Sequence, residues 1–360
     1  MVEWLAGNRL RGTTAERPSV SLQSPSVGGW VEVGRFTASG TVSSMPVTSL
    51  PDKRYYMYLS HYTTNADGQR IEMNSDTGSN YSWRYSNNGG SDSTSTSQTN
   101  ILGGYGGSGL EEFNMGYIAN KSNKEKLTQT WTNSYGGSGA GNAPNRREIV
   151  GKWANTSNAI DELDFPPASS TFQSGAEVVV LGWDPSDSHT TNFWEELASV
   201  ELGSAENSLS TGTFTAKKYL WIQCYVPSSS GGADNYVIRV GNNTIDSGSN
   251  YSQRYNINGG AQGSGTQVNQ DKIRLSFNIS SGSEWFFANS FIINNSGNEK
   301  LLISHANRNS TTGAGTAPSR YEMVGKWANT SNQINIIDLL HQNSSSSLGA
   351  GTIIKVWGSD

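Results

Sequence analysis

The chain has 360 residues and a net charge of −5 at pH 7, which is enough length for two domains that each bury a core. The acidic balance argues against a protein whose main partner is nucleic acid, because phosphate binding needs a basic surface. Only 34% of the residues are hydrophobic and 15% are charged, while Gly contributes 41 residues. Gly and small polar residues form turns and disfavour long helices, so the composition favours short strands joined by many turns.

Residues that bind metals or form disulfides are scarce. Cys224 is the single cysteine, which excludes an intrachain disulfide and any Cys-based zinc site. The four histidines show no metal-ligand spacing. No apolar run approaches the length of a membrane-spanning helix, and the N-terminus lacks the apolar core of a signal peptide. We therefore expect a protein made in a cytoplasm, with no membrane span, no cofactor and no bound metal.

The first segment, residues 1–28, has no counterpart before the second repeat described below, and it shows little periodicity. Such a segment is mobile when nothing holds it. We predict that it is an extended N-terminal arm that docks on a neighbouring copy of the same protein. The alternative is that the arm folds back onto its own first domain. The contact residues expected in the arm are Trp4, Arg9, Arg11 and Arg17.

Short β-rich runs separated by Gly, Ser and Asn turns follow the arm. The first group lies at residues 30–36, 55–62, 70–73, 113–119, 127–132, 148–153, 160–163 and 178–181. The second group lies at residues 194–202, 219–226, 236–240, 272–279, 285–293, 301–304, 321–327, 334–340 and 352–357. Eight or nine such runs per group, with long glycine-rich connections, predict an all-β fold of two tandem antiparallel β-sandwich (jelly-roll-like) domains. The expected domains span 29–184 and 192–360, with a linker at 185–191.

An internal repeat supports two domains. "GAGNAPNRREIVGKWANTSN" (residues 139–158) returns as "GAGTAPSRYEMVGKWANTSN" (residues 313–332), with sixteen of twenty positions identical. "DTGSNYSWRYSNNGG" (residues 76–90) returns as "DSGSNYSQRYNINGG" (residues 246–260), with eleven of fifteen identical. The order of such matches is kept along the chain. A period this long indicates two domains rather than a solenoid of short units.

The longer repeated string predicts a strand followed by a turn. Alternation places Arg146, Glu148 and Lys152 on one face, and Trp153 on the other. We expect the Trp to fill the sandwich core while the charged residues lie on a solvated face. The Asn-Thr-Ser-Asn that follows is typical turn chemistry.

The shorter string carries a repeated Tyr-Arg-Tyr pattern. Aromatic residues with Arg on a loop are typical of sugar or peptide contacts, and the structural alternative is that they pin a long loop across the sandwich edge. The candidate ligand or partner loops contain Tyr81, Arg84, Tyr85, Tyr251, Arg254 and Tyr255.

No catalytic set is shared by the two copies. The acidic residues common to both have no second shared carboxylate nearby in sequence, and no histidine occurs at matching positions. "VGKW" lacks the pattern of a phosphate-binding loop, and "NSDTGSN" (residues 74–80) is only a faint match to a calcium loop. We therefore predict no catalytic residues and no metal site. An enzyme with one specialised domain is the remaining alternative.

The combination of "EWLAGNRLRGTTAERP", "DTGSNYSWRYSNNGG" and "APNRREIVGKWANTSN" closing on "VVLGWD" resembles virion structural proteins of environmental, largely marine, viruses and phages. The resemblance covers nearly the whole chain. It implies a virion component and carries over no catalytic residue. The tandem arrangement is also similar to double jelly-roll capsid proteins, although the halves of those proteins usually differ more in sequence.

We therefore expect a viral structural protein of the capsid, its decoration or a tail or fibre. Such a protein would self-assemble through domain faces and the N-terminal arm, with copies of itself and other virion proteins as partners. The alternative is a receptor- or glycan-binding adhesin module of a virion or cell surface. The expected location is the virion, after synthesis in a host cytoplasm.

Overall fold

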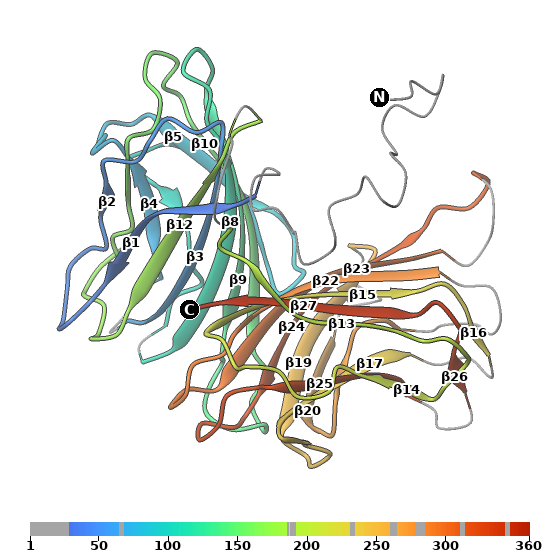
Figure 1. The fold of residues 1–360 in the computed structure, drawn as a ribbon. Coiled ribbons are helices and arrows are strands. Elements are labelled where there is room, and N and C mark those ends of the chain that lie inside the picture. Colours follow the sequence, from blue (N-terminus) through green and yellow to red (C-terminus); the bar gives the residue numbers. More distant parts are fainter. Residues whose placement is uncertain are drawn as a thin grey trace, which may run out of the picture.

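A computed structural model describes residues 29–64, 68–107, 109–185, 187, 192–230, 235–259, 265–277, 285–309, 314–342 and 346–360. Within these ranges the chain is all-β and contains no helix, which confirms the predicted fold class. The strands form two antiparallel β-sandwiches in tandem, β1–β12 and β13–β27 (Figure 1). The predicted arm lies outside the described residues, as does most of the predicted linker.

The first sandwich contains an eight-stranded and a four-stranded sheet. The large sheet has the order β1 (Val31–Thr37), β12 (Glu177–Trp183), β3 (Tyr55–Thr63), β8 (Glu111–Ala119), β9 (Lys126–Ser134), β10 (Asn145–Trp153), β5 (Tyr81–Asn87) and β6 (Ser93–Gln98). The small sheet has the order β2 (Val47–Thr48), β11 (Glu162–Asp164), β4 (Arg70–Met73) and β7 (Ile101–Leu102). Strands consecutive in sequence often lie in different sheets, as in a jelly roll.

The second sandwich repeats this order. Its large sheet runs β13 (Glu195–Glu201), β27 (Ile353–Ser359), β15 (Tyr219–Val226), β22 (Trp285–Ile293), β23 (Lys300–Asn309), β24 (Ser319–Trp327), β19 (Tyr251–Ile257) and β20 (Gly265–Gln270). Its smaller sheet runs β14 (Ser208–Ser210), β25 (Ile336–His341), β17 (Tyr236–Asn242) and β18 (Thr244–Ile245), with β21 (Ile273–Arg274) paired to β17. Strands β16 (Ser229–Ser230) and β26 (Ser347–Leu348) form a separate pair.

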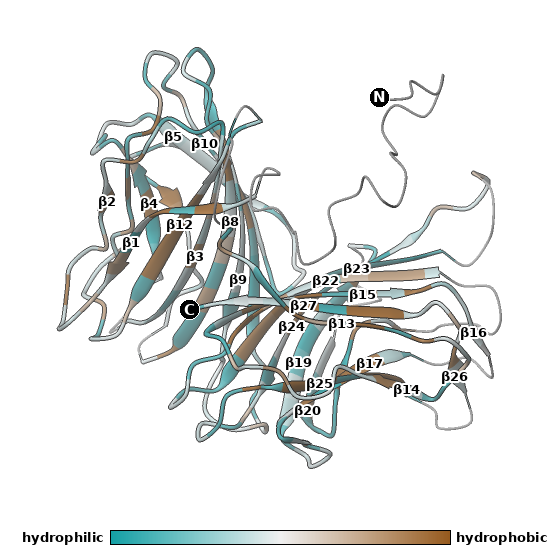
Figure 2. Ribbon diagram, viewed as in Figure 1, coloured by the Kyte–Doolittle hydropathy of each residue, from teal (hydrophilic) through white to brown (hydrophobic). Residues whose placement is uncertain are grey.

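Alternation along the strands divides apolar side chains between two cores. In β3, Tyr56 and Tyr58 point into the first sandwich, whereas Met57 and Leu59 point out of it. The outward residues are nevertheless buried, because they join an apolar cluster that also contains residues of the second sandwich. Figure 2 shows apolar and polar segments along the strands of both sandwiches. The described residues form three hydrophobic cores, one inside each sandwich and one between them.

Candidate functional site: the interface between the two sandwiches

The core between the sandwiches joins the outer faces of the two large sheets. Its apolar centre includes Leu59, Phe113 and Met115 from the first sandwich and Leu301, Ile303 and Val324 from the second. All six side chains are buried. Strand β9 packs against β23 and β10 against β24, so strands at equivalent positions of the two repeats meet here.

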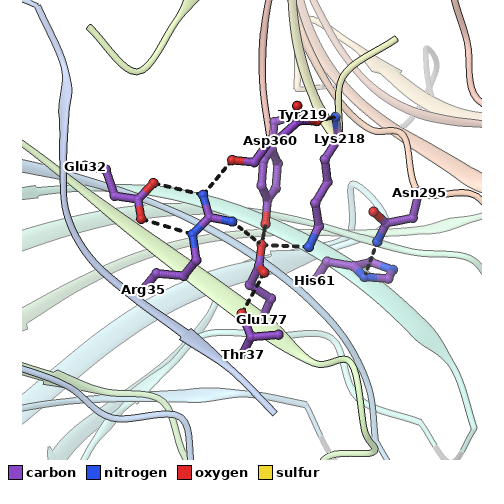
Figure 3. Close-up of polar contacts among 9 residues, drawn as sticks. All are labelled: Glu32, Arg35, Thr37, His61, Glu177, Lys218, Tyr219, Asn295 and Asp360. Carbon is purple, nitrogen blue, oxygen red and sulfur yellow. Dashed lines mark hydrogen bonds and ion pairs between the residues drawn. The ribbon is translucent and has the colours of Figure 1, made fainter. Parts of the chain in front are cut away.

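A cluster around Glu177 adds polar contacts at one edge of this interface (Figure 3). The Glu177 carboxylate lies 2.7 Å from the Lys218 ammonium and accepts a 2.7 Å hydrogen bond from the Tyr219 hydroxyl, both on the second sandwich. Arg35 donates to the same carboxylate at 3.2 Å and also to the backbone oxygen of Asp360. Burial alone raises the pKa of a carboxyl, but the hydrogen bonds from Lys218 and Tyr219 hold the pKa of Glu177 below its usual range.

His61 lies beside this cluster, where its Nδ1 is 3.1 Å from the amide nitrogen of Asn295 on the second sandwich (Figure 3). Burial lowers the pKa of His61 to about 4, and the Lys218 charge contributes in the same direction while Glu177 opposes it. The imidazole is therefore neutral at neutral pH. Its protonation at acid pH places a charge inside the interface.

The repeated string forms β10 and β24 with the turns that follow, and its charged face is not the solvated face that the sequence predicts. Arg146 is buried and donates to the carboxylate of Glu322 at 3.2 Å and to its backbone oxygen at 2.8 Å. Lys326 is fully buried and lies 2.9 Å from Glu299. The prediction is wrong at these positions because each face is covered by the other sandwich, which alternation within one strand cannot indicate. Lys152 remains at the surface, 2.9 Å from Glu125.

Glu148 and Glu322, which occupy the same position in the two copies of the repeated string, lie near each other across the interface. Burial and the neighbouring Glu148 charge raise the pKa of Glu322. Burial would also raise the pKa of Glu148, but the neighbouring His305 ring and the charges of Arg146 and Arg320 lower it. The two carboxyls are therefore shifted in opposite directions.

Asn133 links the first sandwich to the backbone of the second. Its side-chain amide donates to the oxygens of Leu302 at 2.8 Å and Gly325 at 2.9 Å. Trp131 packs edge-on against His305, with ring centroids 5.1 Å apart. These contacts fix the position of β9 over β23 and β24.

A glycine-rich loop after β9 extends the interface across the second sandwich. The backbone oxygens of Ala140, Asn142 and Pro144 accept hydrogen bonds from Asn269, Ser252 and Arg254 respectively. The backbone N–H of Gly139 donates to Glu299 at 2.6 Å, and Lys326 donates to the backbone oxygen of Tyr135 at 3.1 Å. The loop is therefore held mainly by its backbone.

The tryptophan of the repeated string fills each sandwich core, as predicted. Trp153 donates from its ring nitrogen to Asp76 at 2.7 Å, and Trp327 donates to Asp246 at the same distance. Each aspartate also accepts from the backbone N–H two residues later and from an asparagine side chain. Within each sandwich, the longer repeated string therefore contacts the shorter one through this Trp–Asp hydrogen bond. The two aspartate carboxylates are fully used in contacts that stabilise the fold.

The predicted Tyr-Arg-Tyr loops are strands β5 and β19, which corrects the loop assignment. Tyr81 and Tyr251 are buried, and their hydroxyls hydrogen-bond the backbone of Met73 and of Val240 in the opposite sheet. The period-2 alternation of aromatic residues was masked by flanking Gly, Ser and Asn. These two tyrosines therefore cannot contact a ligand without leaving the core.

The other four candidates differ in exposure. Arg254 donates to Pro144 of the interface loop at 2.9 Å, and the Tyr255 ring stacks on Phe277. The Arg147 guanidinium lies over the Tyr85 ring. Arg84 is more than half exposed and is 3.3 Å from Asp92. The structure does not bring the four together into one site.

The remaining predictions concern absent or undescribed features. Among the described residues, no group of three or more His, Cys, Asp or Glu side chains is arranged to hold a metal ion. In the same part of the chain, no helix is long and apolar enough to cross a membrane. Trp4, Arg9, Arg11 and Arg17 lie outside the described residues.

Sequence comparisons identify no family. No protein-family model and no curated protein matches this chain. Among solved structures, domains LG4-5 of the mouse laminin alpha1 chain align at 11% identity and a TM-score of 0.20, covering 91% of this chain and 89% of that one. The mavirus major capsid protein aligns at 6% identity and a TM-score of 0.14, covering 99% of this chain and 92% of that one. TM-scores this low carry no argument about function.

Proposed function

We propose that this protein is a self-assembling structural subunit of a virus particle. The observation that carries the proposal is the interface core, in which the large sheets of two similar sandwiches bind each other face to face. A module whose outer sheet face binds its own duplicate is suited to binding further copies. The virion setting comes from the resemblance of the repeated strings and the arm to virion structural proteins.

The polar residues of the repeated strings support a structural role. Asp76, Trp153 and their second-copy equivalents hold the sandwiches together internally. Arg146, Glu322 and Lys326 hold the sandwiches to each other. These side chains are therefore committed to structural contacts.

Deletion of residues 1–28 tests the part played by the arm. We expect the truncated protein to keep both sandwiches folded and to lose the ordered assembly of the full chain. Negative-stain imaging and mass photometry at matched concentrations measure the difference. Full chain that stays monomeric over a wide concentration range contradicts the proposed function, whereas unchanged assembly after truncation contradicts only the role of the arm.

Glycan binding is a second candidate function, and it is supported by a different surface from the predicted loops. Trp30, Tyr55, Tyr117 and Trp183 line a shallow groove of about 420 Å³ on the first large sheet, with Gln129 beside them. Aromatic rings beside a polar side chain suit sugar stacking. A glycan array probed with wild type and with Trp183→Ala tests this function, and the absence of any Trp183-dependent signal contradicts it.

A further inference from the structure

The outer face of each large sheet can be divided into two halves along the direction of its strands. The two sandwiches meet through halves that are not equivalent in the repeat. The first sandwich contributes the half that contains His61, Phe113 and Asn133, whereas the second contributes the half that contains Leu301, Val324 and Lys326. In the repeat, Leu301 corresponds to Leu127 and Phe113 corresponds to Phe287. The contact is therefore heterologous, and each sandwich keeps the half that its duplicate uses.

Each of the two unused halves carries an exposed apolar patch. The first open patch consists of Tyr55, Leu127 and Val150, and the second open patch consists of Tyr225 and Phe287. Leu127 is 57% exposed whereas its equivalent Leu301 is 0% exposed, and Phe287 is 39% exposed whereas Phe113 is 1% exposed. These five residues are most of the large hydrophobic side chains that are exposed in the described part of the chain. Clustered exposed apolar side chains mark interaction surfaces.

The loop that docks on the second sandwich also has an unused duplicate. Residues 140–144 lie against Ser252, Arg254 and Asn269, whereas the equivalent residues 314–318 are exposed. The equivalent groove on the first sandwich is open and is lined by Ser82, Arg84 and Lys152 among others. Because the docked loop is held through backbone oxygens, the change from Asn142 to Thr316 does not remove the contacts.

We propose that a second copy of this chain binds head to tail, with Tyr225 and Phe287 of one copy against Leu127 and Val150 of the next. In this contact, residues 314–318 of the first copy lie along the groove at Ser82 and Arg84 of the next. The arrangement repeats between chains the contact that already exists within the chain. It rests on the proposed function, because it specifies the faces through which the subunit assembles.

The contact between chains is more polar at its centre than the contact within the chain. Met115 and Ile303 of the internal interface correspond to Asn289 and Gln129, which lie in the unused halves beside the open patches. Fewer apolar atoms are buried, so the contact between chains is weaker and reversible. Repetition of a head-to-tail contact gives a ring if the rotation closes and a filament if it does not.

Complementation between two single variants tests the polarity of the contact. Leu127→Asp disables the first open patch and Phe287→Asp the second, and neither should unfold the chain because both side chains are exposed. We expect each variant to lower self-association about 30-fold or more, as expected for residues at the centre of an interface. An equimolar mixture should form a dimer that does not grow, because one intact pair of patches remains. Val268→Asp, at an exposed position outside both patches, is the matched control and should assemble like wild type.

Sedimentation velocity separates the outcomes. Wild-type assembly that survives both Leu127→Asp and Phe287→Asp overturns this contact and leaves the proposed function standing. Variants that do not complement each other in the mixture overturn the head-to-tail arrangement. A wild type that stays monomeric overturns both proposals, and glycan binding lost in Leu127→Asp would then assign the first open patch to a sugar.

Discussion

Lys152 and Lys326 occupy the same position of the same repeated string and have opposite surroundings. Lys152 lies at the surface beside Glu125, whereas Lys326 is buried between Glu299 and the backbone of the interface loop. The strand and the tryptophan after each lysine are the same. The difference shows that the repeated string determines the internal structure of each sandwich. The neighbouring sandwich determines whether a residue on the outer face is buried or exposed to solvent.

Replacement of the two lysines gives the largest expected difference between the sandwiches. Lys326→Ala leaves Glu299 buried without its cation, so we expect the free energy of unfolding to fall by about 3–5 kcal/mol. Lys152→Ala removes an exposed ion pair and should cost about 0–1 kcal/mol. Urea unfolding followed by tryptophan fluorescence measures both. Equal losses would contradict the asymmetry of the two positions.

His61 of the first sandwich should contribute a loss of stability between about pH 6.5 and pH 4. Its equivalent in the second sandwich is Tyr225, so the second sandwich has no matching histidine. The folded pKa of about 4 lies below the 6.5 of an ordinary histidine, so the unfolded chain binds more protons between these values. Stability from neutral His61 is therefore present above pH 6.5 and is lost as the pH falls to about 4. The expected loss is on the order of 3 kcal/mol.

Thermal unfolding at pH 7 and pH 4.5 measures this loss. The control His61→Gln keeps an acceptor for Asn295 and does not titrate. We expect a smaller difference between the two pH values in this variant. The same difference in wild type and variant would assign the acid sensitivity to other groups.

Trp153→Phe and Trp327→Phe should have the same effect, because each tryptophan donates to an equivalent aspartate at 2.7 Å. Loss of a hydrogen bond to a charged group costs about 1.5–3 kcal/mol. Chemical unfolding of both variants checks the equality. A clear difference between them would show that the sandwich cores are less alike than the structure indicates.

The smallest expected effect concerns Asn133 and its equivalent Asn307. Asn133→Ala removes two hydrogen bonds across the interface and should cost about 1–2 kcal/mol. Asn307 is exposed, so Asn307→Ala should change the stability by less than about 0.5 kcal/mol. Hydrogen exchange at the amides of β23 and β24 reports whether the Asn133 variant loosens the interface. Unchanged hydrogen exchange in that variant would show that Asn133 does not help to position the two sandwiches.

The sandwich fold was predictable because alternation and turn residues are local signals. The strands at Tyr55–Thr63 and Trp285–Ile293 agree with their predicted bounds, and Trp153 fills the core as expected. The sequence does not predict strand β5, because its aromatic residues stand between clusters of turn formers. The sequence does not predict the interface for a different reason, since the interface depends on contacts between residues far apart in the chain.

One signal of the interface was nevertheless present in the sequence. Strands β3, β12 and β22 are apolar on both faces, which is typical of strands buried on both sides. A sheet of that kind needs a covering layer on its outer face. The sequence does not reveal which layer covers it or which half stays open, because both copies carry nearly the same string.

The backbone contacts of residues 139–144 have a consequence for how the duplicated halves can diverge. Backbone carbonyl groups are present whatever the side chain, so substitutions at Ala140, Asn142 and Pro144 leave the hydrogen bonds to their oxygens intact. Gly139 is the exception, because its φ of 80° strains any other residue. Insertions or deletions shift every carbonyl relative to its donor and would break the set together. Natural variation in this loop should therefore appear as changes of residue type at constant length, and a length change should coincide with altered contacts between the two halves.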